Sequence, residues 1–202
     1  MNITFIIRTG LVSALLMAMG CTPAVVTPMP QAVRQIAVLP PYYPGAADTP
    51  TAGTDSDLLR PLQMTVGDVL AQQARMRLAE KGLDVVAPNV VQLATGGRVP
   101  TSPHMAAEIL RQANLDAAAL YIEVRRWEPM PDARALKADG IIVALDVAIV
   151  DPKTGAILWQ VHRPSRPVPL YGVVLTGQAN VFVAETVMRE IFAQLGSKKP
   201  SA

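Results

Sequence analysis

The segment 141–160 constrains the fold of this chain more than any other part of the sequence. Large aliphatic side chains alternate with smaller ones over residues 141–150, a period of two that predicts a β-strand with both faces largely covered. The sequence DPKTG at residues 151–155 has the residue types of a tight turn, and apolar side chains alternate again over 157–161. The segment therefore predicts a β-hairpin.

The rest of the chain predicts further strands that alternate with helices. Apolar runs predict strands over 33–39, which stops at Pro40, over 83–87, which lies between Gly82 and Pro88, and over 117–124. Apolar residues at helical spacing predict helices over 61–78, 103–113 and 184–195. Between these elements we expect loops, including a proline-rich one over 164–169 and a brief turn capped by Asn89.

The order of these elements, β-α-β-α-β-β-β-α, defines the expected fold class. We expect an α/β (α+β) fold: a mixed β-sheet with a C-terminal β-hairpin pair and about three packed helices. The chain has 202 residues, which is long enough for one compact domain and its attachments. We place that single domain at 33–196 and expect a disordered tail at 197–202.

The amino terminus has the pattern of an export signal over residues 1–20. Arg8 precedes an apolar stretch of about ten residues, which is the length of a signal-peptide core and too short for a membrane-spanning helix. The stretch ends on Ala18, Met19, Gly20 and Cys21, which resembles the bacterial lipobox, although Ala18 stands where Leu is commonest and Met19 where a small residue is commoner. The resemblance implies cleavage between Gly20 and Cys21 and acylation of Cys21.

Cys21 is therefore expected to anchor the protein to a membrane. The alternative is an ordinary cysteine after a conventional signal or an uncleaved anchor. Two or three acyl chains hold a protein stably, whereas one binds only marginally. Residues 21–32 contain three prolines and predict an extended, lipidated tether. Thr22 stands where an Asp would retain an enterobacterial lipoprotein in the inner membrane, so resemblance favours the periplasmic side of the outer membrane, with the inner membrane as the alternative.

Charge and cysteine content exclude several kinds of partner. The formal net charge is only +2, from 18 basic and 16 acidic residues, so general nucleic-acid binding is not expected. The one cysteine and two separated histidines cannot complete the usual structural zinc site, and one cysteine cannot form an intramolecular disulfide. We expect no metal and no cofactor.

Catalytic motifs are missing from the sequence, which contains no GxSxG, GxxxxGK[ST], HExxH or CxxC pattern. We predict no catalytic residue and a protein that is not an enzyme. Asp146 lies on the small-residue face of its strand, where a buried carboxylate needs a partner or a raised pKa. The alternative is an envelope enzyme that uses Asp146 or His162, whereas His104 is more simply a solvated histidine.

Two groups of residues are candidate contacts for a protein or anionic partner. Arg125, Arg126 and Trp127 follow one predicted strand, and Arg163 and Arg166 follow another, so neighbouring strand ends would form a basic rim with an aromatic side chain. The plainer interpretation is a set of solvated strand ends. The second group, Tyr42 and Tyr43, is either a packing corner or an exposed contact.

Three segments together resemble one family of bacterial lipoproteins. They read QIAVLPP at 35–41, AALYIEVRRW at 118–127 and LDVAIVDPKTGAILWQ at 145–160. They are similar to an uncharacterised lipoprotein family typified by a neisserial lipoprotein antigen. The similarity extends more loosely to the superfamily of the TolB amino-terminal domain, the curli-secretion lipoprotein and lipoprotein activators of penicillin-binding proteins.

This resemblance implies a TolB-like, periplasm-facing domain that is an accessory to an envelope protein complex and has no enzyme activity of its own. The leading hypothesis is an auxiliary lipoprotein of an ABC-type transport or secretion assembly. The alternative is an activator of a penicillin-binding protein. Since the related curli-secretion lipoproteins form rings, the resemblance also makes a homo-oligomer an option.

Overall fold

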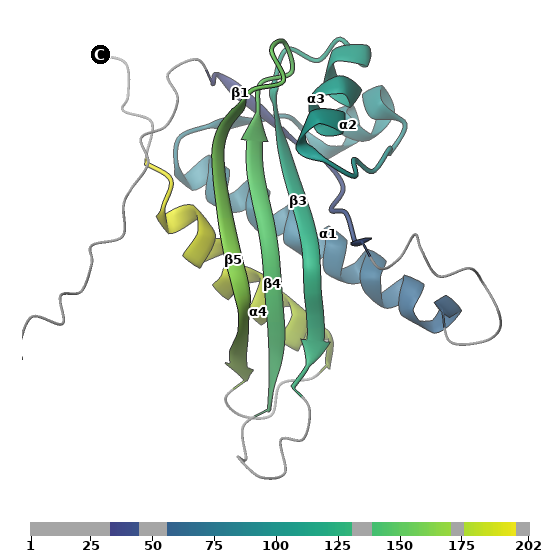
Figure 1. The fold of residues 1–202 in the computed structure, drawn as a ribbon, viewed down its shortest axis with the longest axis vertical. Coiled ribbons are helices and arrows are strands. Elements are labelled where there is room, and N and C mark those ends of the chain that lie inside the picture. Colours follow the sequence, from purple (N-terminus) through teal and green to yellow (C-terminus); the bar gives the residue numbers. More distant parts are fainter. Residues whose placement is uncertain (1–32, 45–55, 131–138, 171–175, 197–202) are drawn as a thin grey trace, which may run out of the picture.

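The computed structural model describes residues 33–44, 56–130, 139–170 and 176–196 (Figure 1). The predicted signal at 1–20, Cys21, the tether and the tail at 197–202 lie outside the described residues. Among the helices within those ranges, none combines the length and the apolar character needed to cross a membrane.

The centre of the fold is one five-stranded mixed sheet in the order β2-β1-β3-β4-β5. The short strands β1 (Gln35–Val38) and β2 (Asp84–Val85) run parallel to each other, and β1 runs parallel to β3 (Ala118–Pro129). The long strands β4 (Asp139–Val150) and β5 (Ile157–Leu170) complete the sheet in antiparallel pairing. The predicted α/β class and the hairpin are confirmed.

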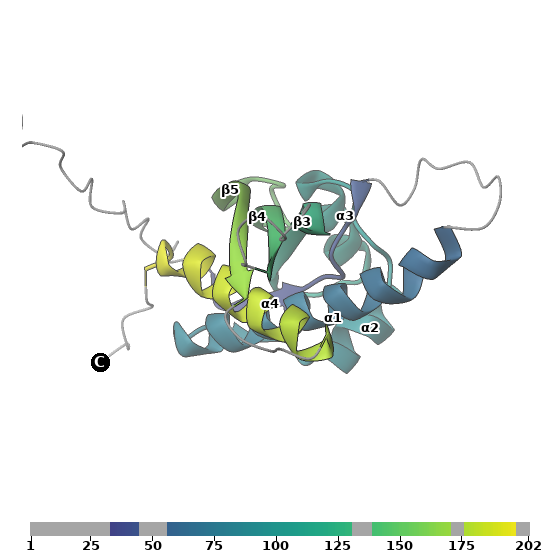
Figure 2. The same ribbon diagram turned by 90° about the horizontal axis from the view of Figure 1, so that it is seen from below.

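Two helices cover one whole face of this sheet, as the view from below shows (Figure 2). They are α1 (Ser56–Glu80) and α4 (Thr176–Ala193), which pack against each other and against the large side chains of the strands. The larger core lies here and includes Leu70, Leu145 and Val187, each fully buried. The bulky face predicted for residues 141–150 therefore faces α1 and α4.

Two shorter helices cover only part of the opposite face (Figure 1). They are α2 (Pro88–Thr95) and α3 (Pro103–Gln112), and their smaller core includes Ile109 packed among alanines of the sheet such as Ala119 and Ala148. Beyond α3, no helix of the described part of the chain lies over β3, β4 and β5 on this side (Figure 1). The prediction that both faces of residues 141–150 are largely covered is confirmed, because each of these residues is buried or half-buried, although neighbouring side chains rather than a helix lie beside Ala144.

The proline-rich loop predicted over 164–169 is wrong, because β5 continues through it to Leu170. Pro167 pairs with Ile142 and Pro169 with Gly140. A proline has no backbone N–H, so in a central strand it would leave a carbonyl of a neighbouring strand without its hydrogen bond. The strand β5 is the last of the sheet and has a neighbour on one side only, so the N–H groups on its other side are not needed for pairing. Prolines two residues apart place their missing donors on the outer side.

The brief turn predicted after Pro88 is also wrong, since this segment forms the helix α2, and the described residues contain four helices rather than about three. Pro88 follows the end of β2 by three residues and is the first residue of the helix, where its missing N–H costs nothing. The predicted cap of α3 is confirmed: the Ser102 hydroxyl accepts a hydrogen bond from the Met105 N–H at 3.2 Å. Asn114, with a φ of 51°, ends this helix as predicted.

Candidate functional site

The part of the sheet that no helix covers, on the side of α3, is called the open face below. It carries a row of polar and mostly charged side chains. The register places Glu123 on β3 opposite Asp146 on β4, and Asp146 opposite His162 on β5. Cross-strand neighbours in register are the closest side-chain pairs that a sheet offers. The open face comprises Glu123, Arg125, Arg126, Glu128, Asp146, His162 and Ser165.

Asp146 is the centre of the row and has two partners. Its Oδ2 lies 3.1 Å from Arg125 Nε, and its Oδ1 lies 2.5 Å from His162 Nδ1. Arg125 Nη2 lies 2.8 and 3.1 Å from the two ring nitrogens of His162, so the three side chains form one cluster. The Asp146 side chain is 21% exposed and that of His162 is 54% exposed. The carboxylate therefore has the charged partner that its position on the small-residue face required.

Tyr121 connects this row to the loop in front of α3. Its hydroxyl donates to Glu123 Oε2 at 3.0 Å and also lies 3.3 Å from the Thr101 carbonyl oxygen. Burial, followed by the hydrogen bond to Glu123 and the charge of that carboxylate, raises the pKa of Tyr121 above its ordinary value of 10.0. Tyr121 therefore stays a neutral donor that fixes Glu123 at the border of the covered and open faces.

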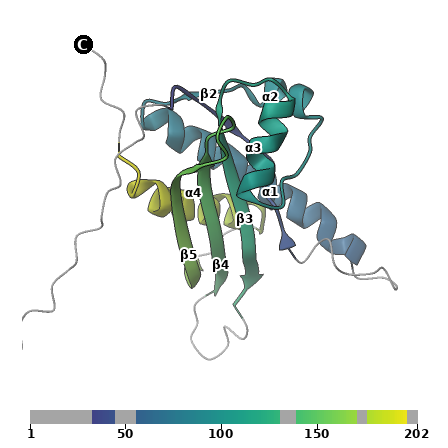
Figure 3. The same ribbon diagram turned by 45° about the horizontal axis from the view of Figure 1, so that its top comes forward.

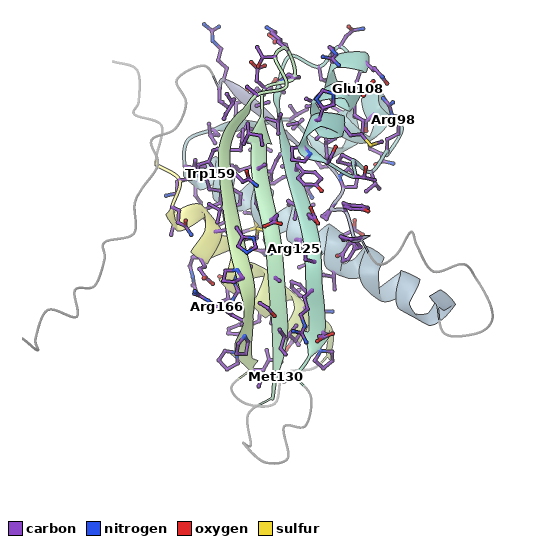
Figure 4. The ribbon with its side chains drawn as sticks, in the orientation of Figure 1. Arg98, Glu108, Arg125, Met130, Trp159 and Arg166 are labelled. Carbon is purple, nitrogen blue, oxygen red and sulfur yellow. The ribbon has the colours of Figure 1, made fainter. Side chains whose placement is uncertain are left out.

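A β-bulge places two consecutive arginines on the open face. The pairing of β3 with β4 shifts register between Val124 and Arg126, so the strict alternation of sides is interrupted there. Arg125 reaches Asp146, and Arg126 forms an ion pair with Glu128 and donates to Ser165 Oγ at 3.2 Å. Figure 4 shows Arg125 in the middle of the three long strands.

Trp127 and Arg163 do not belong to this surface, so the predicted basic rim with an aromatic does not form as a single patch. Trp127 packs against the larger core and donates to Asn180 Oδ1 of α4 at 3.3 Å. Arg163 is only 5% exposed, and its Nε lies 3.0 Å from Glu190 Oε2 of α4. Arg163 Nη1 also donates to the Val143 carbonyl at 2.5 Å. Both residues lie inside strands rather than after them, and both face α4.

Tyr42 and Tyr43 pack against the domain. The Tyr42 N–H donates to the Ile122 carbonyl at 2.9 Å, and the Tyr42 carbonyl accepts from the Val124 N–H at 2.8 Å, which extends the pairing of β1 beside β3. Tyr42 is partly buried against the smaller core and Tyr43 against the larger one. Burial and the charge of Asp68 raise the pKa of Tyr43. The geometry is that of a packing corner.

A separate hollow of about 360 Å³ lies where β1 and β3 begin, beside the turn between β4 and β5. Its lining includes Val33, Ala118 and the ion pair of Asp116 with Lys153, whose atoms are 2.9 Å apart. Neither Asp146 nor His162 lines it. Within the described ranges, no group of three or more histidine, cysteine or acidic side chains is placed to hold a metal ion. His104 lies against the same turn, next to Gly155.

The fold and the open face define a class of protein: a mixed α/β domain whose sheet is fully covered on one face and presents paired charges on half of the other. No protein-family model and no curated protein sequence matches this chain. Among solved structures, the chain is similar to the PelC dodecamer from Paraburkholderia phytofirmans, with 14% identity over 85% of this chain and 94% of that one and a TM-score of 0.48.

Two further solved structures are similar to this chain, and the first is a lipoprotein by name. Lipoprotein GNA1162 from Neisseria meningitidis has 17% identity over 78% of this chain and 97% of that one, with a TM-score of 0.47. The LpoB C-terminal domain from Salmonella enterica has 14% identity over 64% of this chain and 80% of that one, with a TM-score of 0.29. Similarity at this level leaves function to be argued from the residues of this chain.

Proposed function

We propose that this protein is a lipid-anchored, periplasm-facing accessory protein of the bacterial envelope, without enzyme activity of its own. In this proposal Cys21 is the acylated anchor, and the open face is the surface that contacts a protein partner. The finer role that we favour is that of an auxiliary lipoprotein in an ABC-type transport or secretion assembly.

The observation that carries the proposal is the pairing of charges on the open face. Arg125, Asp146 and His162 satisfy one another across three strands, and Arg126 is paired with Glu128. A set of mutually paired charges on a broad sheet surface supports recognition, because a partner must match its pattern to avoid leaving a charge unpaired. The alternative, an enzyme that uses Asp146 or His162, requires a carboxylate with access to a substrate pocket. The hollow at the start of β1 does not provide that pocket for either residue.

Affinity capture after in-cell crosslinking tests the contact surface. Reversing the charge of Arg125 and Arg126 together, R125E and R126E, should reduce recovery of the partner at least tenfold, because each reversal places like charges opposite Asp146 or Glu128 and repels an acidic partner group. Arg189→Glu on α4 is the matched control, since Arg189 is an exposed arginine on the other side of the sheet. Equal recovery from the charge-reversed protein and the wild type would rule out the open face as the contact surface.

The same capture distinguishes the finer roles and tests the anchor. Recovery of transport or secretion subunits supports the favoured role, whereas recovery of penicillin-binding proteins supports the alternative, an activator of a peptidoglycan synthase. Membrane fractionation of wild type beside Cys21→Ser tests acylation: the wild type should be in the membrane fraction and the variant should be released. If both fractionate alike, Cys21 is not the anchor.

A further inference from the structure

The solvent-facing side of α2 carries no charge and exposes Val90 and Leu93 beside the polar Asn89 and Gln92, which is unusual for a surface helix. No charged residue occurs from Val85 to Gly97. The inner side of α2 packs into the smaller core through Val91, yet Leu93 is 83% exposed, and Val90 and Val99 are each 43% exposed. Surface helices normally place charged residues on the side that faces water. Exposed apolar groups gathered in one place mark a contact with another apolar surface.

This helix lies at the end of the domain where the chain enters. Val86 and Val91 pack with Ala37 and Leu39 of the β1 segment, so α2 is fixed to the first strand of the domain. Figure 3, in which this end comes forward, shows α2 close to β2, which it follows in the chain. The uncovered halves of β3, β4 and β5 extend toward the opposite end (Figure 1).

The length of chain before β1 limits how far this end can lie from a membrane. Cys21 precedes Val33 by twelve residues. At 3.3 to 3.6 Å per residue, even a fully extended chain of that length spans at most about 40 Å. If Cys21 carries the acyl chains, the domain stays within about 40 Å of the lipid surface, and α2 can reach that surface.

We propose that the outer side of α2, with Val90 and Leu93, rests on the lipid surface that holds the acylated Cys21. This inference rests on the proposed function, because it requires the anchor. The absence of charge on the helix and the short covalent connection favour lipid over a protein as the occupant. Apolar side chains that enter the interface between lipid headgroups and acyl chains add to the membrane affinity of a protein. Since no charge is involved, the contact should not weaken as salt is raised.

Fluorescence quenching by brominated lipids tests this contact in the full-length, acylated protein. The protein is reconstituted into phosphatidylethanolamine and phosphatidylglycerol vesicles, with and without bromine on the acyl chains, and flotation confirms the anchoring. Leu93→Trp should lose at least half of its added emission in brominated vesicles, equally at low and high salt. Phe182→Trp is the matched control, because Phe182 is an apolar residue of α4 with 42% exposure, and its emission should not change. Val90→Trp provides a second position on α2.

The outcomes separate the inference from the proposed function. Floating vesicles with no quenching at Leu93→Trp or Val90→Trp would overturn the lipid contact and leave the anchor intact. A blue shift at position 93 that grows with protein concentration, without quenching, would identify a second copy as the occupant and also overturn it. Failure of the wild type to float with the vesicles would overturn both the anchor and the contact that depends on it.

Discussion

Arg163 of β5 and Glu190 of α4 form an ion pair between the sheet and its covering helix, with Nε 3.0 Å from Oε2. The arginine is buried and also binds the Val143 carbonyl, whereas the Glu190 side chain is 43% exposed. This arginine therefore holds α4 against the edge strand. Its role is structural rather than one of partner contact.

Arg163→Ala should lower the free energy of unfolding by about 2 kcal/mol, because it removes three hydrogen bonds of a buried charged group and the packing of its aliphatic part. Arg166→Ala is the matched control, since Arg166 is exposed on the same strand, and it should change stability by less than about 0.5 kcal/mol. Urea unfolding of both variants measures the difference. Equal losses of unfolding free energy in the two variants would mean that the buried Arg163 contributes no more to stability than the exposed Arg166.

Asp146→Ala should lower the free energy of unfolding by about 1 kcal/mol, because Arg125 and His162 both lose their charged partner. In a double-mutant cycle with Arg125→Ala, the coupling should be about 0.5 to 1 kcal/mol, since the pair is partly exposed and screened by water. Glu128→Ala, which breaks a more exposed pair, should cost less. Strict additivity in the cycle would contradict a direct interaction between Arg125 and Asp146.

The turn between β4 and β5 should make the hairpin sensitive to acid. Asp151 accepts hydrogen bonds from the Lys153 N–H and the Thr154 hydroxyl, both at 2.9 Å, and these hold its pKa below the ordinary 3.8. A lowered pKa in the folded state means that the charged carboxylate stabilises the fold above pH 3.8, and that this contribution is lost as the pH falls through the folded pKa. The stability difference between wild type and Asp151→Asn should therefore shrink as the pH falls below 3.8. A difference that stays constant from about pH 7 to about pH 2 in urea unfolding would contradict this.

Ser102→Ala should lower the free energy of unfolding by about 1 kcal/mol, because the Met105 N–H loses the hydroxyl that caps α3. Ser102→Asp keeps an oxygen at the same position and should retain most of the stability. Thermal unfolding of the two variants side by side measures the effect. If Ser102→Asp unfolds as early as Ser102→Ala, the cap is not the cause.

Local patterns in the sequence predicted most of the elements. The alternation over 141–150 and the cap and proline at 102–103 each depend on neighbouring residues only, and the structure confirms both elements. Pro88 misled the prediction because a proline both ends a strand and begins a helix. Whether β5 lies at the edge of the sheet depends on the order of all the strands, so the prolines after residue 163 could not be recognised as strand residues.

The candidate site could be predicted only in part for the same reason. Alternation placed Asp146 on the small-residue face and required a partner for it, but the identity of Arg125 and His162 as partners depends on the register of three strands. The bulge at Arg125 shifts the alternation by one residue, so Arg125 and Arg126 share a side and Trp127 faces the core. No local signal in the sequence indicated that bulge.

The prolines of β5 also determine how the protein behaves when many copies are crowded together. An unpaired edge strand offers its free N–H groups to the edge of any neighbouring copy, and tethering molecules to a surface raises their local concentration. Pro167 and Pro169 remove two of the donors that such edge-to-edge pairing would need. At the other edge, β2 is only two residues long. Crowded copies can therefore touch through their faces, but the sheet itself is protected against growing into a fibre.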